Sequence, residues 1–265
     1  MGQGHFRFRN DRFTQTGVGV FNRKPRKVDA AQLHRRPVRW FDFMMAAFVT
    51  ILVLSNVLGA GKVAVVHLPV IGDWPFGAGI LFFPLSYVLG DVLTEVYGYA
   101  RARRCIWAGT AAMLFMAFMS TVVVALPPAK EWTGQAAYVQ VFGQVPRIVF
   151  ASIAAFWAGE FANSYIMAKM KLWTNGRYLW TRTIGSTIVG EGVDSAIFYP
   201  AAFLGAIGWT NDLVFKVLLT QWFLKVSWEV LLTPVTYAIV GFLKRAEGVD
   251  VFDEKTDFTP FTAKV

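Results

Sequence analysis

Residues 78 to 98 read AGILFFPLSYVLGDVLTEVYG, and this stretch decides what kind of fold the chain can have. It is apolar over most of its length, and about 20 such residues are enough to cross a bilayer as a helix. It also contains two acids, Asp91 and Glu95. An ionised side chain at mid-membrane costs roughly 2.5 to 3.5 kcal/mol on insertion scales. We therefore expect a membrane helix whose acids face protein and have a function.

The whole chain follows this pattern. It is 55% hydrophobic and 16% charged, with a mean hydropathy of +0.44, which is outside the usual range of soluble domains. The alternating ten-residue segments of a membrane β-barrel are not visible. Five further apolar segments are long enough to span, at residues 40 to 59, 104 to 126, 146 to 169, 181 to 207 and 214 to 242. The sequence predicts an all-α membrane protein with six transmembrane helices, and a short hairpin or surface loop between residues 62 and 77.

The basic residues predict the topology. Residues 1 to 39 carry ten Lys or Arg and two Asp, which is most of the net charge of +9. The connections at 98 to 104 and 169 to 182 and the exit at Lys244 are also basic, whereas the other three connections are nearly neutral. The positive-inside rule then places both termini in the cytoplasm. We interpret residues 1 to 39 as a cytoplasmic tail that anchors the topology and does not bind nucleic acid, 40 to 245 as the six-span domain, and 246 to 265 as a second cytoplasmic tail.

Three predicted spans repeat one motif. It reads GDVLTE at 90 to 95, GEFANS at 159 to 164 and GEGVDS at 190 to 195. Residues at i, i+3 and i+4 share one face of a helix. The motifs therefore project three polar groups of side chains, namely Asp91 with Thr94 and Glu95, Glu160 with Asn163 and Ser164, and Glu191 with Asp194 and Ser195. Hydrogen bonds between helices are one explanation. Five carboxylates favour the other, a shared polar cavity.

The spacing of the motifs suggests an internal repeat. Ser86, Gly90 and Asp91 recur one hundred residues later as Ser186, Gly190 and Glu191. Halves of three spans run in opposite directions across a membrane, so the chain could be a 3+3 inverted repeat, as in many transporters. Such proteins bind their substrates where the two halves meet.

Cations that could balance the acids are few. Lys225 precedes Glu229 by four residues, which predicts an ion pair within one helix. Arg147 and Arg182 lie at the starts of predicted spans, where they could be interface anchors or binding groups. The excess of acids indicates a cationic or donor-rich substrate.

The segments FPLSYVLGDVLTEVYG (83 to 98), PRIVFASIAAFWAGEFANS (146 to 164) and RTIGSTIVGEGVDS (182 to 195) resemble the queuosine precursor transporter family, also called the vitamin uptake transporter family. The resemblance covers about residues 40 to 245 and includes the Ser55-Asn56 pair. It implies uptake across the bacterial inner membrane of 7-deazaguanine precursors of the tRNA base queuosine. These are 7-cyano-7-deazaguanine, 7-aminomethyl-7-deazaguanine and queuine.

The resemblance also suggests which residues bind substrate. A 7-deazaguanine has a ring N–H and an exocyclic amine side by side, which a carboxylate can accept together. We expect one of Glu160, Glu191 and Asp194 to accept from this edge, and an amide to complete recognition. The full expected set is Asn56, Tyr87, Asp91, Glu95, Arg147, Glu160, Asn163, Glu191 and Asp194, with Asp91 and Glu95 available for an aminomethyl cation or a coupling proton.

Two other classes of protein remain open. The chain could be the substrate-binding subunit of an ATP-driven vitamin importer, although it has no P-loop of its own. It could also be an intramembrane enzyme using paired carboxylates, although it lacks HExxH, GxSxG and a Cys-His set. We expect a secondary carrier that is not an enzyme and has no cofactor or metal. Small-residue runs at 151 to 155 and 185 to 192 could pack within one bundle or between protomers of a homo-oligomer.

Overall fold

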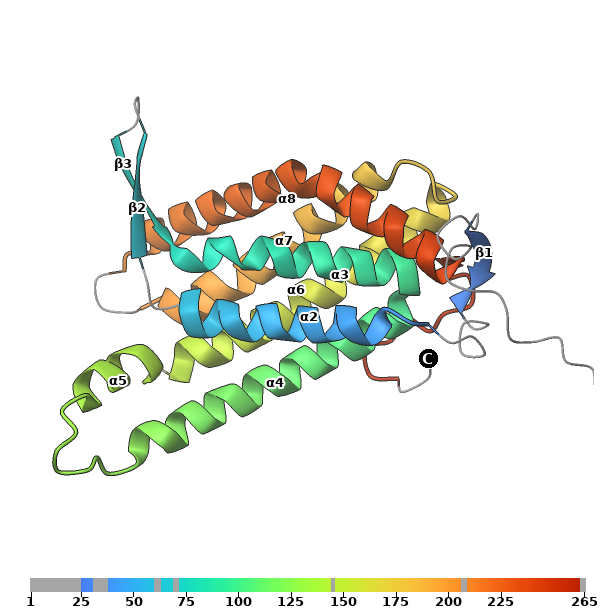
Figure 1. The fold of residues 1–265 in the computed structure, drawn as a ribbon. Helices are drawn as coiled ribbons and strands as arrows, with labels where there is room; N and C mark the ends of the chain where they lie inside the picture. The colour runs from blue at the N-terminus through green and yellow to red at the C-terminus, as the bar shows by residue number, and fades with distance from the viewer. Residues whose placement is uncertain are drawn as a thin grey trace, which may run out of the picture.

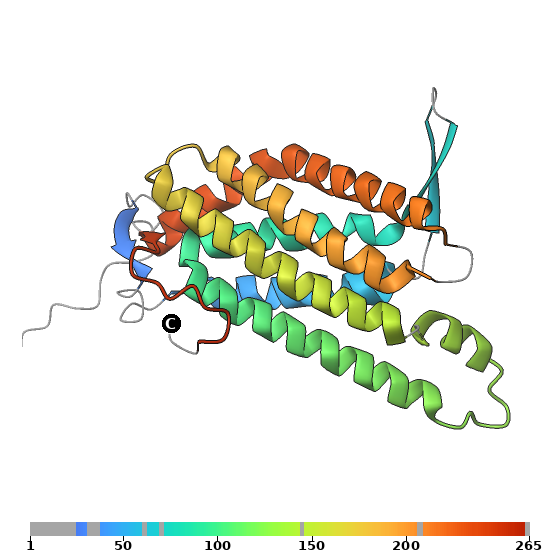
Figure 2. The same ribbon diagram turned by 180° about the vertical axis from the view of Figure 1, so that it is seen from behind.

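The structure is a computed structural model that describes residues 25–30, 38–59, 63–68, 72–143, 146–205 and 209–262. Six long helices in these ranges lie side by side and alternate in direction (Figures 1 and 2). They are α2 (Phe41–Leu54), α3 (Phe83–Tyr97), α4 (Tyr99–Ala125), α6 (Pro146–Trp173), α7 (Leu179–Phe203) and α8 (Asn211–Glu247). A π-helical turn, η2 (Ser55–Gly59), extends α2, and a 3-10 turn, η3 (Ala78–Leu81), precedes α3.

Four helical stretches in the described residues are long and apolar enough to cross a membrane. They are Phe41–Leu58, Gly79–Tyr97, Tyr99–Ala125 and Asn211–Glu247. The outward faces of the helices are apolar, with Phe115 and Phe118 of α4 and Phe223 of α8 each more than 60% exposed. Large exposed apolar side chains on long helices need lipid around them. The chain is a helical membrane protein, as predicted.

The two ends of the bundle differ. At one end, β2 (Val63–Leu68) and β3 (Gly72–Gly77) form an antiparallel hairpin, which confirms the hairpin predicted for this connection (Figure 1). The short helix α5 (Gln135–Phe142) lies at the same end, within a connection predicted as loop. At the other end, β1 (Arg26–Asp29) pairs in parallel with β4 (Val249–Phe252). This pairing joins the two segments that we interpreted from the sequence as separate N-terminal and C-terminal tails.

The connection between α3 and α4 corrects the prediction for residues 98 to 104. One residue, Gly98, makes the turn with φ +84°, a conformation that favours glycine. α4 then begins at Tyr99, so the predicted basic loop is the first turn of a helix. The Asp253 carboxylate accepts the Tyr99 backbone N–H at 3.1 Å and caps this helix start from the far end of the chain.

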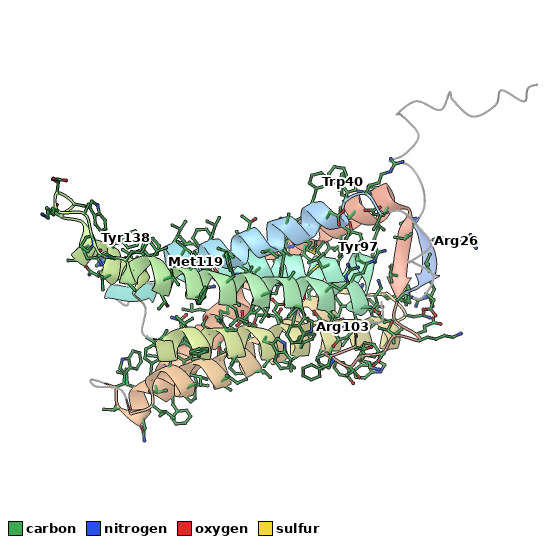
Figure 3. All side chains as sticks on the ribbon, turned by 90° about the horizontal axis from the view of Figure 1, so that it is seen from below. Arg26, Trp40, Tyr97, Arg103, Met119 and Tyr138 are labelled. Carbon is green, nitrogen blue, oxygen red and sulfur yellow. The ribbon has the colours of Figure 1, made fainter. Side chains whose placement is uncertain are left out.

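Residues 253–262 pack along α4 and α6. Arg103 donates from Nη1 to the carbonyl oxygens of Asp257 (2.7 Å) and Thr259 (2.9 Å). Figure 3 shows Arg103 at the same end of the bundle as Arg26 and Trp40, far from Tyr138. Arg103 is only 2% exposed, so a residue expected in a loop is instead a buried donor that holds the C-terminal segment.

The apolar core lies on one side of α3. Val92, Leu93 and Val96 of this helix pack with Phe48 of α2 and Ile106 of α4. Asp91 and Glu95 are also fully buried, and their side chains meet partners on α6, α7 and α8. One face of α3 therefore packs in the apolar core, and another face carries two buried acids.

Candidate functional site

A close contact between α6 and α7 brings two of the acidic motifs together. A Cβ atom added to Gly159 would lie 2.9 Å from the Cβ of Asp194 and 3.0 Å from the carbonyl oxygen of Gly190. A Cβ added to Gly190 would lie 2.7 Å from the Cβ of Asn163 and 3.0 Å from the carbonyl oxygen of Gly159. Only glycine fits at either position without moving the helices apart. The two motifs therefore pack on each other reciprocally.

The third motif, GDVLTE on α3, contacts the motif on α6. A Cβ added to Gly90 would lie 2.8 Å from Oε2 of Glu160, so this glycine makes room for that carboxylate. Asn163 donates from Nδ2 to Oδ1 of Asp91 at 2.7 Å, and Thr94 donates to Ser164 at 3.1 Å. The three motifs that are far apart in the sequence thus meet at one place.

Lys225 of α8 contacts two acids of the motif on α7. The Lys225 ammonium lies 2.7 Å from Oε2 of Glu191 and 2.7 Å from Oδ2 of Asp194, both on α7. The predicted ion pair with Glu229 is wrong, because both Glu229 carboxylate oxygens are without a hydrogen-bond partner. Spacing of four residues permits such a pair, but two carboxylates on the neighbouring helix attract the ammonium more strongly than one does.

We call the resulting group the acidic cluster. It consists of Asp91, Glu160, Glu191, Asp194 and Glu229, together with Lys225. The side chain of Asp194 is 15% exposed, and the other four acids are at most 2% exposed. Among the described residues, the five carboxylates have one ammonium group near them, that of Lys225, and it contacts two of the five. Burial of this many like charges is too costly unless protons or a ligand neutralise them.

Many polar atoms of the acidic cluster and the residues next to it have no hydrogen-bond partner among the described residues. These buried atoms come from four helices and are Tyr87 OH, Asp91 Oδ2, both Glu160 oxygens, Asn163 Oδ1, Thr187 Oγ1, Ser195 Oγ and both Glu229 oxygens. In folded proteins nearly every buried polar atom is paired, and each exception calls for an explanation. Most of these atoms are acceptors. The arrangement is suited to a ligand with several N–H donors, to a cation or to protons.

A second group of buried charges lies toward the end of these helices where β1 pairs with β4. The Arg182 guanidinium binds Glu95 through two parallel bonds, Nε to Oε2 and Nη2 to Oε1, both 2.8 Å. Lys171 and Lys244 also contact Oε1 of Glu95, and both reach Asp250 of β4, at 2.9 and 2.7 Å. We call Glu95, Lys171, Arg182, Lys244 and Asp250 the paired cluster. It ties α3, α6, α7 and α8 to β4.

In the paired cluster, three cations contact two carboxylates. Burial raises the pKa of Asp250, but the ammonium groups of Lys171 and Lys244 lower it by more, so its net pKa lies below the usual value. Lys171 and Arg182 were expected in a basic connection, yet they are 2% and 1% exposed. Arg182 is therefore not an interface anchor. The basic residues that predict the topology also hold the helix ends together.

Of the nine expected binding residues, six gather around the acidic cluster: Tyr87, Asp91, Glu160, Asn163, Glu191 and Asp194. Glu95 belongs to the paired cluster. Arg147 begins α6, thirteen residues and about 20 Å of helix before Glu160, and the placement of its side chain is outside the described residues. The sequence reasoning missed Glu229 and the part played by Lys225, because their spacing explained both as one ion pair.

Asn56 lies elsewhere in the bundle. Its amide donates to the carbonyl oxygen of Leu52 at 2.9 Å, and Ser152 donates to its Oδ1 at 3.4 Å. It borders a cavity of about 330 Å³ between η2, α4, α5 and α6. The other walls of this cavity are mostly apolar side chains such as Leu114 and Phe150, and no acid of the acidic cluster lines it.

A helical membrane protein with charged and amide groups buried between its helices is of the class that moves small polar molecules across bilayers. Comparison with known proteins identifies a family within this class. Residues 77–239 match the family model described as "Putative vitamin uptake transporter". This match covers more than half of the chain and all three motifs, so the chain belongs to the vitamin uptake transporter family. The resemblance found in the sequence is confirmed.

Two bacterial relatives have names that state a substrate. A Bacillus subtilis (strain 168) protein named "Probable queuosine precursor transporter" is 30% identical over 161 residues, which cover 60% of this chain and 69% of the relative. An Escherichia coli (strain K12) protein named "Queuosine precursor transporter" is 27% identical over 165 residues, which cover 58% of this chain and 72% of the relative. No solved structure matches the chain.

Proposed function

We propose that this chain takes up a 7-deazaguanine precursor of queuosine across the bacterial inner membrane as a secondary carrier. The names of its two relatives support the substrate class. The acidic cluster supports the location of the substrate site, because it combines unpaired acceptors with the Tyr87 hydroxyl between four helices. The candidates for the substrate are 7-cyano-7-deazaguanine, 7-aminomethyl-7-deazaguanine and queuine.

One observation carries the proposal, namely that both carboxylate oxygens of Glu160 are buried and without a partner. A 7-deazaguanine presents two adjacent N–H donors, and a carboxylate can accept both in parallel. A site built to pair such an edge rejects rings that lack one of the donors, since an acceptor would then remain unpaired. Glu160 is therefore the residue that we assign to the base edge.

The neighbours of Glu160 are assigned supporting roles. Tyr87 OH lies 3.0 Å from the position of a Gly159 Cβ, beside Asp194, and has no partner in the structure. Its free hydroxyl can donate to the ring carbonyl oxygen. Asn163 is oriented by its bond to Asp91 and offers a free Oδ1 to a further donor. Glu191 and Asp194, which now hold Lys225, can accept an aminomethyl cation in its place.

The transmembrane arrangement is part of the proposal. We infer six spans, with α6 and α7 crossing in addition to the four most apolar stretches. Their lower apolarity has a cause, because Glu160, Lys171, Arg182 and Glu191 are buried between helices and do not face lipid. The recurrence of Ser86, Gly90 and Asp91 of α3 as Ser186, Gly190 and Glu191 of α7 supports two inversely related halves. Both termini are then cytoplasmic, at the end with the basic residues.

The test is uptake of labelled precursor by cells that cannot synthesise it. The Glu160→Gln variant keeps the size of the side chain but replaces one acceptor oxygen with a donor, so we expect uptake to fall at least about tenfold, the equivalent of one lost charged hydrogen bond. Asp212→Asn is the matched control, since this acid is 74% exposed and pairs only with Lys216 in the described structure. Uptake by Glu160→Gln equal to that by the control would exclude the assignment.

The same protein in liposomes separates a carrier from a subunit of an ATP-driven importer. A carrier exchanges labelled for unlabelled precursor across the liposome membrane without ATP or any other protein. A binding subunit binds the precursor but exchanges none. We expect exchange.

A further inference from the structure

Glu229 of α8 is the acid of the cluster for which the sequence motifs give no role. Its side chain is 1% exposed, and neither of its carboxylate oxygens has a hydrogen-bond partner. Thr233, one turn later, donates to the backbone carbonyl of Glu229 and not to its carboxylate. The Glu229 carboxylate is therefore buried between helices without the donors that an ionised carboxylate requires.

The charged groups that face Glu229 are acids. Asp91 of α3, Glu160 of α6 and Glu191 of α7 each interact with it through space. On its own helix, Lys225 lies one turn earlier, but its ammonium is 2.7 Å from both Glu191 and Asp194. In this arrangement an ionised Glu229 would lie among acids with no cation of the described residues in contact with it, because Glu191 and Asp194 hold Lys225. Uptake of a proton removes the cost of this buried charge while Lys225 stays on α7.

We infer that Glu229 is a proton-binding site that couples substrate uptake to the pH gradient. The inference rests on the function proposed above. In the structure Lys225 lies against Glu191 and Asp194, and we assign the protonated form of Glu229 to this arrangement. When the proton leaves, the ionised Glu229 has a partner within reach, because residues at i and i+4 are neighbours on a helix. Lys225 can then turn from α7 to Glu229.

Movement of the Lys225 ammonium between the two acids of α7 and Glu229 gives the carrier two charge states. In the protonated state Lys225 neutralises α7, and Glu160 is available for the base edge. In the deprotonated state Lys225 neutralises Glu229, and the negative charge moves to Glu191 and Asp194. A proton enters with the substrate from the more acidic side and leaves on the more alkaline side, so the proton and the substrate move in the same direction.

The experiment uses the full chain in liposomes, with 7-cyano-7-deazaguanine as the probe because it is uncharged. The membrane potential is held at zero, and the interior is one pH unit more alkaline. Coupling to one proton allows the wild type to accumulate the probe up to about tenfold, since one pH unit and a tenfold concentration ratio are equal in free energy. For Glu229→Gln we expect a ratio near 1, with exchange of preloaded probe retained.

Three controls make the result decisive. Glu229→Asp keeps a titratable group and should still accumulate the probe, and Asp212→Asn, on the exposed part of α8, should match the wild type. Accumulation by Glu229→Gln, or loss of its exchange, overturns the inference. Wild-type exchange that does not respond to the pH gradient also overturns it and leaves the proposed function intact. Absence of wild-type exchange contradicts the proposed function itself.

Discussion

The acidic cluster and the paired cluster lie next to each other on α3, and they differ in how their charges are balanced. Asp91 and Glu95 are four residues apart, which is about 6 Å of helix rise. Glu95 meets three cations, whereas the one partner of the Asp91 side chain among the described residues is the Asn163 amide. Both acids are fully buried, so burial alone does not distinguish the two regions. The two regions differ in the number of charged partners that each buried acid has.

This difference separates two uses of buried charge. In the paired cluster, hydrogen bonds and opposite charges fix the relative positions of four helix ends, and removal of one partner would leave another charge unpaired. In the acidic cluster, the free acceptors have not been used for folding and are available to a ligand or to protons. Loss of an ion-pair partner, in the paired cluster or at Lys225, should therefore reduce stability. Replacement of Glu160, the acceptor assigned to the substrate, should reduce transport, and replacement of Glu229 should remove only its coupling to protons.

The largest effect on stability is expected for Arg182→Met. It leaves Glu95 without its two parallel bonds at 2.8 Å in a site that water does not reach. Loss of one partner of a buried ion pair costs about 3 to 5 kcal/mol, which would be measured as a lower unfolding temperature of the purified protein in detergent. The double variant Glu95→Gln with Arg182→Met should recover part of the loss. A loss below about 1 kcal/mol in the single variant would show that the pair contributes little.

Lys225→Met should destabilise less, by about 2 to 3 kcal/mol, the range for removing a partner from a buried charged group. Glu191 and Asp194 lose their shared ammonium, but the side chain of Asp194 is 15% exposed and can bind water instead. Thermal unfolding of the purified protein in detergent tests this, with Lys216→Met as the matched control on the same helix, because Lys216 is 71% exposed and pairs with the exposed Asp212. Equal unfolding temperatures for the two variants would contradict a structural role for Lys225.

A smaller loss, of about 1 to 2 kcal/mol, is expected for Gly190→Ala, within the usual range for overpacking. The added methyl group would lie 2.7 Å from the Cβ of Asn163, and both atoms are fixed by backbone. Gly192→Ala is the matched control on the same helix, because its nearest neighbour, Trp222 Nε1, would be 3.6 Å away. Equal unfolding temperatures for the two variants would contradict the close contact of α6 and α7.

The smallest effect concerns pH. The folded-state pKa of Asp250 is lowered by Lys171 and Lys244, which outweigh its burial. A lowered folded-state pKa stabilises the protein above the unfolded-state pKa, and this stabilisation is lost as the pH falls through the folded-state value. Asp250→Asn should therefore reduce stability at pH 7 and change it less below about pH 4, the unfolded-state pKa of an aspartate. Acid unfolding curves of the wild type and the variant should converge there.

Much of this architecture could be predicted from the sequence. Runs of apolar residues predict the long helices, and the spacing of GEFANS and GEGVDS predicts that their acids project together. The partners could not be predicted, because the sequence does not say which helices are neighbours. Lys225 was matched with Glu229 on its own helix, when two acids on α7 hold it. Likewise Lys171 and Arg182 appeared to belong to a loop, because nothing local indicates that Glu95 lies opposite them.

The most direct test of the central claim is ligand-induced stabilisation of the purified protein. A ligand at one hundred times its Kd stabilises a folded protein by about 2.7 kcal/mol. We expect 7-cyano-7-deazaguanine to raise the unfolding temperature of the wild type and to have no effect on Glu160→Gln, whose own unfolding temperature should stay close to that of the wild type. The same stabilisation of both proteins by the ligand would contradict the claim that the acidic cluster binds the substrate.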